Sequence, residues 1–208
     1  LTNKKFTTLA KVGRTLYAPP YSENSNWDIL LKFDGTDWHS ERTGLTQTSR
    51  MYYSHTVARN GKIYFPPAGH DEDWSEMLII DSYFDKWYTK DLGIGKESKK
   101  YFTGVENSAG KIYYIPRGGC VCEPLDTWKS QGDLAEILVV DTSDDSHYTI
   151  DIGEYFSDST TIEKYNNCVI INDVIFAFPY GESETFQTVL VFDTKIEKVI
   201  HTLDLNNV

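Results

Sequence analysis

Long apolar runs, cysteine and methionine are scarce in this sequence of 208 residues. No stretch approaches the roughly 18 consecutive apolar residues of a membrane-spanning helix, so no membrane span is predicted. The two Met and the few runs of strong helix formers disfavour a helical bundle. The sequence has three cysteines, Cys120, Cys122 and Cys168. An odd number gives no complete disulfide framework, so cysteine usage does not indicate whether the protein's compartment is oxidising or reducing. A disulfide from Cys120 or Cys122 to Cys168 remains one alternative.

Basic residues are also in the minority. Lys and Arg number 20 against 31 Asp and Glu, which gives a net charge of −11. Nucleic acids and anionic membranes attract basic surfaces, so neither is expected as a partner. A negative charge of this size is otherwise typical of an acidic protein kept in solution by its charge.

Signatures of catalysis and of metal binding are missing too. The sequence contains no Gly-x-Ser-x-Gly and no phosphate-binding loop. His55 falls on an expected strand, where a structural role is the simpler interpretation. The segment His70-Asp71-Glu72-Asp73 gathers possible ligands without the spacing of a calcium loop, and Cys120-Val121-Cys122 lacks a second cysteine pair. We therefore predict no catalytic residue, no metal and no cofactor.

What the sequence does contain is a fourfold internal repeat. Each copy has an apolar residue and an aromatic anchor three residues before Pro, and later an apolar run closed by Asp. From anchor to Asp is seventeen residues in three copies and twenty-eight in the third, which carries an insertion of eleven. The anchors are Tyr17, Tyr64, Tyr113 and Phe176, the closing residues are Asp34, Asp81, Asp141 and Asp193, and aromatic marks eleven residues before the anchors are Phe6, Tyr53, Phe102 and Tyr165.

Each copy reads as four short antiparallel strands. In the second copy the strands are expected at 53–57, 62–65, 77–81 and 87–90, with a hairpin turn at Asn60-Gly61. Four strands in about 50 residues, repeated along the chain, are typical of β-propeller blades. We therefore predict an all-β, β-propeller fold of four four-stranded antiparallel blades in one domain, 1–208. The expected blades are roughly 1–44, 45–93, 94–153 and 154–208.

The copies resemble kelch repeats. The resemblance rests on Gly-Lys-Ile-Tyr in the second strand (61–64 and 110–113), on the Asp closing the third strand, and on Trp87 opening the fourth. It covers the whole chain. The departure is Pro-x-Gly where kelch repeats carry a diglycine, which only Gly118-Gly119 approaches. The chain is thus kelch-like, and four blades either close as a ring or belong to a larger one.

Kelch-like domains generally bind partners through the loops that join strands two to three and four to one, and the resemblance implies the same here. The two-to-three loops differ between copies and are acidic, as expected of binding loops on a rigid scaffold. Basic residues cluster beside the first aromatic marks, where they either bind a carboxylate, a phosphate or an acidic peptide, or neutralise the acidic loops. Trp128, in the insertion, has no counterpart and is the aromatic expected to face a partner. The candidate partner-binding residues are Lys5, Arg50, Tyr53, Lys99, Lys100, Lys164, His70, Asp71 and Trp128.

The sequence thus predicts a non-catalytic interaction module that presents variable loops to a protein or peptide. One alternative is a lectin-like propeller that binds carbohydrate or another small ligand through the aromatic residues and acidic loops. A propeller-fold hydrolase or lyase is the other, and it needs His and carboxylates to converge, whereas only His55 lies on an innermost strand. Compartment and oligomeric state are left open by the sequence.

Overall fold

The computed structural model describes residues 6–20, 28–44, 52, 54–67, 75–93, 101–116, 135–155, 165–179 and 187–205. Over these ranges the chain forms sixteen strands and one 3-10 helix, η1 (Gly153–Tyr155). The described part has no helix long and apolar enough to span a membrane. The chain divides into two compact units, Leu1–Lys96 and Glu97–Val208, each of which holds two antiparallel four-stranded sheets.

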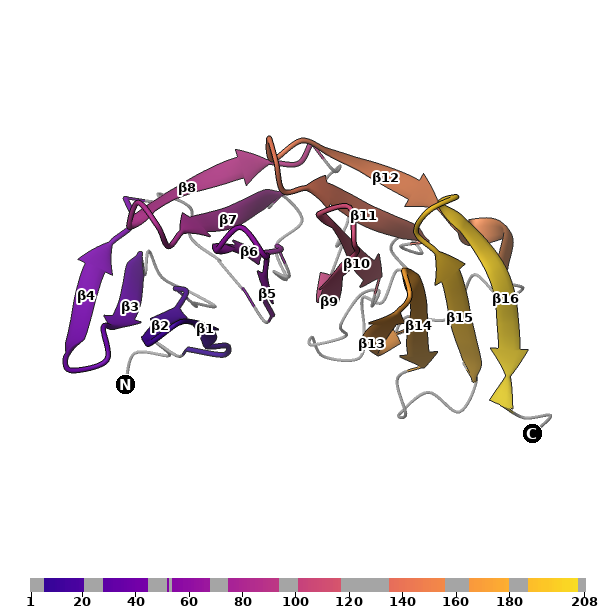
Figure 1. Ribbon diagram of the computed structural model, residues 1–208, viewed down its shortest axis with the longest axis horizontal. Coiled ribbons are helices and arrows are strands. Elements are labelled where there is room, and N and C mark those ends of the chain that lie inside the picture. Colours follow the sequence, from indigo (N-terminus) through magenta and orange to yellow (C-terminus); the bar gives the residue numbers. More distant parts are fainter. Residues whose placement is uncertain are drawn as a thin grey trace, which may run out of the picture. The chain divides into compact units, whose positions relative to one another are not determined.

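The first unit contains sheets 1 and 2, in which the strands lie side by side in chain order (Figure 1). Short strands and tight turns follow the predicted pattern, and the predicted second strand of sheet 2 coincides with β6. The strands of sheet 1 are β1 (Ala10–Val12), β2 (Thr15–Ala18), β3 (Ile29–Phe33) and β4 (Trp38–Arg42); those of sheet 2 are β5 (Thr56–Val57), β6 (Lys62–Phe65), β7 (Glu76–Asp81) and β8 (Lys86–Asp91).

The second unit contains sheets 3 and 4, built in the same way (Figure 1). The four sheets confirm the predicted succession of four-stranded antiparallel blades. The strands of sheet 3 are β9 (Tyr101–Glu106), β10 (Lys111–Pro116), β11 (Glu136–Asp141) and β12 (His147–Asp151); those of sheet 4 are β13 (Tyr165–Ile171), β14 (Val174–Pro179), β15 (Thr188–Asp193) and β16 (Lys198–Asp204).

Each unit has an apolar core between its two sheets. Because side chains alternate along a strand, every second residue of the paired strands points into this core. In the first unit the core includes Ala10, Tyr17 and Leu30 of sheet 1. The core residues of sheet 2 are Ile63, Phe65, Leu78 and Ile80. The core of the second unit joins Tyr113, Ile115, Ile137 and Val139 of sheet 3 to Cys168, Ile175, Ala177, Leu190 and Phe192 of sheet 4.

The repeated Asp has a structural role in the turn after the third strand of each sheet. Asp81 Oδ1 accepts hydrogen bonds from the backbone N–H groups of Tyr83 and Phe84, both at 3.1 Å. Such side-chain bonds replace backbone ones and fix a tight turn. Asp34, Asp141 and Asp193 accept equivalent bonds in their own sheets. The repeat is therefore a repeat of turn chemistry as well as of apolar strands.

An ion pair joins the two sheets of each unit at these turns. In the first unit Lys32 Nζ lies 2.6 Å from Oδ1 of Asp85, which is in the turn between β7 and β8. In the second unit Lys111 Nζ lies 3.0 Å from Oε1 of Glu197, which is in the turn between β15 and β16. Both acids stand four residues after the turn Asp, with φ of 53°. These pairs were not predicted from the sequence, although an acid at this position is visible in three of the four aligned copies.

Candidate functional site

The long connections of every sheet leave from one end. In each sheet the segment between the second and third strands lies at the end opposite the Asp turns, because neighbouring strands are antiparallel. These segments are 10, 10, 19 and 8 residues long and differ in most of their sequence, whereas the Asp turns share the same side-chain hydrogen bonds. The connections span residues 19–28, 66–75, 117–135 and 180–187.

The predicted partner-binding residues belong to these connections or to the segments that precede each sheet. All nine lie outside the described residues: Lys5, Arg50, Tyr53, Lys99, Lys100, Lys164, His70, Asp71 and Trp128. Their grouping into one surface therefore stays a prediction. The structure does describe the residues next to them, where the first strand of each sheet begins.

Buried aromatic rings mark the start of the first strands. Tyr52, Tyr101 and Tyr165 are fully buried and occupy equivalent positions, each four residues before the residue that pairs with the anchor. The turn after the first strand is one residue longer in sheets 2 and 3 than in sheets 1 and 4. The equivalent aromatic is therefore twelve residues before the anchor in sheets 2 and 3, and eleven in the others. Because the same spacing of eleven was expected in every copy, the aromatic marks were predicted at Tyr53 and Phe102, one residue after the equivalent Tyr52 and Tyr101. The side chains of Tyr53 and Phe102 lie outside the described part.

These rings hold the bases of the predicted binding segments. The ring of Tyr52 packs 6.0 Å, centroid to centroid, from that of Phe65, and the Tyr52 carbonyl oxygen accepts a 2.6 Å hydrogen bond from Thr7 Oγ1 in the segment before β1. Burial raises the pKa of the Tyr101 and Tyr165 hydroxyls, so both stay neutral. Neutral, buried phenols fit a packing role.

His55 adds a titratable group to the same region of the first unit. Its Nδ1 lies 2.8 Å from Thr8 Oγ1, and its ring packs 6.0 Å from that of Phe65. Burial lowers the pKa of His55 below its usual 6.5. The imidazole is thus held neutral by its surroundings, in keeping with a structural role.

We expect this burial to make stability depend on pH. Because the folded pKa is depressed, the unfolded chain takes up the proton first, so the His55 contribution is complete above pH 6.5 and is lost as the pH falls below it. The melting temperature of the wild type should therefore fall more between pH 7 and pH 5 than that of His55→Gln. Thermal unfolding followed by circular dichroism at several pH values measures the difference. If the melting temperatures of the two proteins depend on pH in the same way, the effect does not come from His55.

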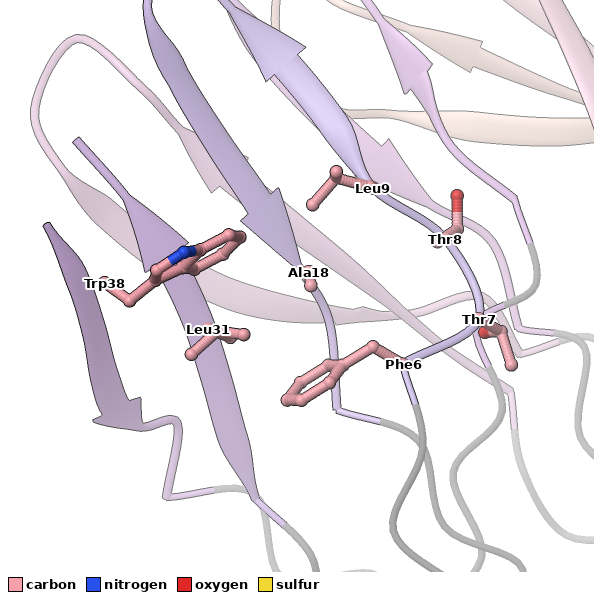
Figure 2. A pocket seen from close by; sticks show the side chains of 7 residues that line it. All are labelled: Phe6, Thr7, Thr8, Leu9, Ala18, Leu31 and Trp38. Atoms are coloured by element: carbon pink, nitrogen blue, oxygen red, sulfur yellow. The ribbon is translucent and has the colours of Figure 1, made fainter. Parts of the chain in front are cut away.

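A shallow hollow of about 290 Å³ lies on the side of sheet 1 that faces away from sheet 2. Leu31 and Ala18 lie between the rings of Trp38 and Phe6, and Leu9 closes one side (Figure 2). Thr7 and Thr8 supply the polar part of its lining. The hollow is otherwise apolar and carries no charged side chain.

Catalytic or metal chemistry finds no support in the described ranges. Within them no three His, Cys, Asp or Glu residues lie close enough together to hold a metal ion. Cys168 is a buried free thiol whose pKa burial raises to about 11, against the opposing effect of Thr103 Oγ1 at 3.5 Å. A thiol with so high a pKa is a poor nucleophile at neutral pH. Cys120 and Cys122 lie outside the described residues.

No protein family and no curated protein matches the chain in sequence. Solved structures do match its fold over almost its whole length. The Pan2 WD40 domain of Neurospora crassa covers 96% of this chain with a TM-score of 0.57 and 11% identity. AztD of Citrobacter koseri covers 94% with a TM-score of 0.53 and 10% identity, and a chain of the nidogen/laminin complex covers 94% with 0.54 and 9%.

These likenesses show the fold alone. Together with the four sheets they establish a β-propeller architecture, while the kelch-specific repeat stays a prediction. The chain spans only part of the proteins it matches: 52% of the Pan2 chain, 46% of the AztD chain and 61% of the chain from the nidogen/laminin complex.

Proposed function

We propose that this chain is a non-catalytic interaction module that binds a protein or peptide through the long connections at one end of its sheets. Strong support comes from the contrast between the two ends of each sheet, the end with the Asp turn and the end with the long connection. The Asp turns repeat the same hydrogen bonds in all four sheets, whereas the connections at the other end range from eight to nineteen residues and differ in most of their sequence. Rigid sheets that carry variable loops are a common arrangement for recognition.

The chemistry of the neighbouring residues agrees with binding rather than catalysis. The described aromatic residues at the base of these connections are buried and neutral, and His55 is held neutral by burial. The candidate cations Lys99, Lys100 and Lys164 belong to segments that enter sheets 3 and 4. A partner with acidic or carboxylate groups therefore suits this end of the domain.

A pull-down from the native source tests the proposal. The 208-residue chain is compared with a variant that lacks residues 119–132, which removes the insertion and Trp128 while leaving β10 and β11 intact. We expect a protein partner with the first and none with the second. If both capture the same partner, or neither captures one, the proposal is wrong, and glycan binding becomes the next function to test.

Point variants then locate the surface. Trp128→Ala and a Lys99→Glu/Lys100→Glu double variant should each weaken binding by roughly 30-fold or more, the effect of losing an interfacial hot spot of about 2 kcal/mol. Tyr83→Ala is the matched control, because Tyr83 is exposed in an Asp turn at the opposite end. Titration calorimetry with the captured partner measures the dissociation constants. Equal affinity in all three variants would contradict the proposed surface.

A further inference from the structure

The fourth strand of each sheet is its outermost strand, and its outer edge pairs with no strand in the described part of the chain (Figure 1). Such an edge presents backbone N–H and C=O groups to which an extended peptide can add as a further strand, and folded proteins protect it with Lys, Pro or a bulge. β8 carries Lys86 and Lys90, and β4 ends at Arg42. β16 begins at Lys198, and a bulge shifts its register with β15. Three of the four outer edges therefore carry a protective feature.

The outer edge of β12 has none of these features. The strand contains no Lys, Arg or Pro, and its register with β11 runs without a shift. Tyr148, Thr149 and Asp151 are exposed. The core shared by sheets 3 and 4 lies between sheet faces, so a neighbour that stacks in this way covers a face of sheet 3 and leaves the edge of β12 open. The edge is thus suited to a different kind of contact, the addition of a strand.

The negative charge of the chain is concentrated in the unit that contains β12. Residues 97–208 have 19 Asp and Glu against 8 Lys and Arg, whereas residues 1–96 have 12 of each, so the second unit carries the whole net charge of −11. Within it, residues 135–155 form β11, β12 and η1 and contain neither Lys nor Arg. The acids of this segment are Glu136, Asp141, Asp144, Asp145, Asp151 and Glu154. Charge of one sign favours a partner of the opposite sign.

Sheet 2 has the same acids together with two lysines. Its Glu76, Asp81, Asp85 and Asp91 stand at the positions of Glu136, Asp141, Asp145 and Asp151 in sheet 3. Lys86 of β8 lies directly opposite Asp81, and Lys90 follows on the same strand. Ser146 and Ile150 stand at these two positions in sheet 3. Because opposite charges on neighbouring strands attract, a strand added to β12 fits best if it brings the cations that β8 contributes in sheet 2.

We propose that β12 binds a basic, extended segment of a partner protein, which adds to sheet 3 as a further strand. The backbone of the segment pairs with the edge of β12, and its Lys and Arg side chains lie near the carboxylates of Asp141 and Asp151, at the two ends of the outer strand pair. A second copy of this chain is a poor occupant, because its own β12 edge carries the same negative charge. The inference is independent of the loop-binding proposal, since it uses an outer strand and none of the long connections.

Synthetic peptides test the inference on the 208-residue chain. The probe is a short acetylated peptide of alternating Lys and Val, and the controls alternate Glu and Val or Lys and Pro. The peptide of Lys and Pro keeps the charge, but Pro has no N–H to pair with a strand. In titration calorimetry we expect only the probe to bind, and in hydrogen exchange it should slow the amides of residues 148–151. No binding of the probe, equal binding of the peptide of Lys and Pro, or protection elsewhere than on β12 overturns the proposal.

A charge variant then locates the site. Ser146→Lys/Thr149→Lys places two cations at exposed positions of this edge. Thr149 is chosen over Ile150 because Ile150 packs against the core of the second unit. The variant should bind the probe at least about 10-fold more weakly, because like charges on neighbouring strands repel. Ile196→Lys/Ile200→Lys adds the same charge at exposed positions of sheet 4 and is the matched control.

The control should bind the probe as the wild type does, and circular dichroism should show that both double variants keep the fold. Wild-type affinity in Ser146→Lys/Thr149→Lys, or an equal loss in both double variants, overturns the proposal. Sedimentation velocity without peptide tests the alternative occupant. A dimer in which residues 148–151 are already protected from exchange would assign the edge to a second copy and overturn the proposal as well.

Discussion

Phe192→Ala should destabilise the chain by about 3–5 kcal/mol, the usual effect of removing a large buried ring from a core. Phe192 is fully buried between the two sheets of the second unit, and its ring centroid lies 5.8 Å from that of Tyr113. It also pairs across strands with Ile175 and Val199. The cavity left by alanine is enclosed by strands from both sheets, so it cannot close by the movement of one side chain.

Thermal and urea unfolding measure this effect. At about 2–4 °C per kcal/mol for a domain of this size, the melting temperature should fall by roughly 10 °C. Ile196→Ala is the matched control in the adjoining turn: Ile196 is mostly exposed, so its loss should stay within about 0.5 kcal/mol. A comparable loss for the two variants would mean that the ring of Phe192 does not contribute to a packed core.

The same measurement tests whether the chain is one domain, as the sequence predicts. A single domain unfolds in one cooperative transition, and Phe192→Ala should then shift the whole transition. The structure divides the chain into two compact units at residues 96 and 97. If only one of two transitions moves, the units unfold separately and the single-domain prediction is wrong.

The strands were predictable because their signals are local. The apolar run ending at Asp81 lies in β7, and the expected strand at 87–90 lies within β8. The turn Asp could be found for the same reason, since its hydrogen bonds reach only two or three residues along the chain. Local chemistry repeated four times makes a pattern that a comparison of the chain with itself detects.

Contacts between sheets were not predictable in the same way. Lys111 and Glu197 are 86 residues apart, and no local pattern connects them. The position of Tyr52 was missed because one extra turn residue changes the spacing to the anchor without changing the structure. Beyond the Pro and Gly near their start, the loops of the candidate partner-binding site share little repeated sequence, so mainly their place in the repeat could be inferred. Even so, the sequence did predict the fold in which these contacts arise.

The largest electrostatic effect is expected at Glu197, which lies in the turn between β15 and β16 and accepts hydrogen bonds from three groups of sheet 3. Lys111 Nζ lies 3.0 Å and the Tyr113 hydroxyl 3.1 Å from its Oε1, and the Tyr148 hydroxyl donates to the same oxygen. Partial burial raises the pKa of Glu197, but the hydrogen bonds from Tyr148, Lys111 and Tyr113 outweigh it and leave the pKa below 4.5. The hydrogen bonds that Lys111 donates to Tyr148 and Glu197 raise the pKa of Lys111 to about 12.

Glu197→Gln keeps the size of the side chain and removes its charge. We expect a loss of roughly 1.5–3 kcal/mol at pH 7, the range for hydrogen bonds to a charged group, with Lys111 left beside a neutral amide. Urea unfolding measures the loss of stability. A double-mutant cycle with Lys111→Met separates the contribution of the Lys111–Glu197 ion pair from that of the hydrogen bonds donated by Tyr113 and Tyr148. Lys195→Met is the matched control, because Lys195 is mostly exposed in the same turn and pairs with Asp173 at 3.4 Å.

The response to pH distinguishes the charge from packing. Because the pKa of Glu197 is depressed in the fold, its contribution is complete above pH 4.5 and is lost as the pH falls through the lowered value. The stability gap between wild type and Glu197→Gln should therefore be constant from pH 7 to about pH 5 and narrow at more acid pH. A gap that persists unchanged at pH 3 would assign the effect to the shape of the turn, where residue 197 has a positive φ, rather than to the carboxylate that joins the two sheets.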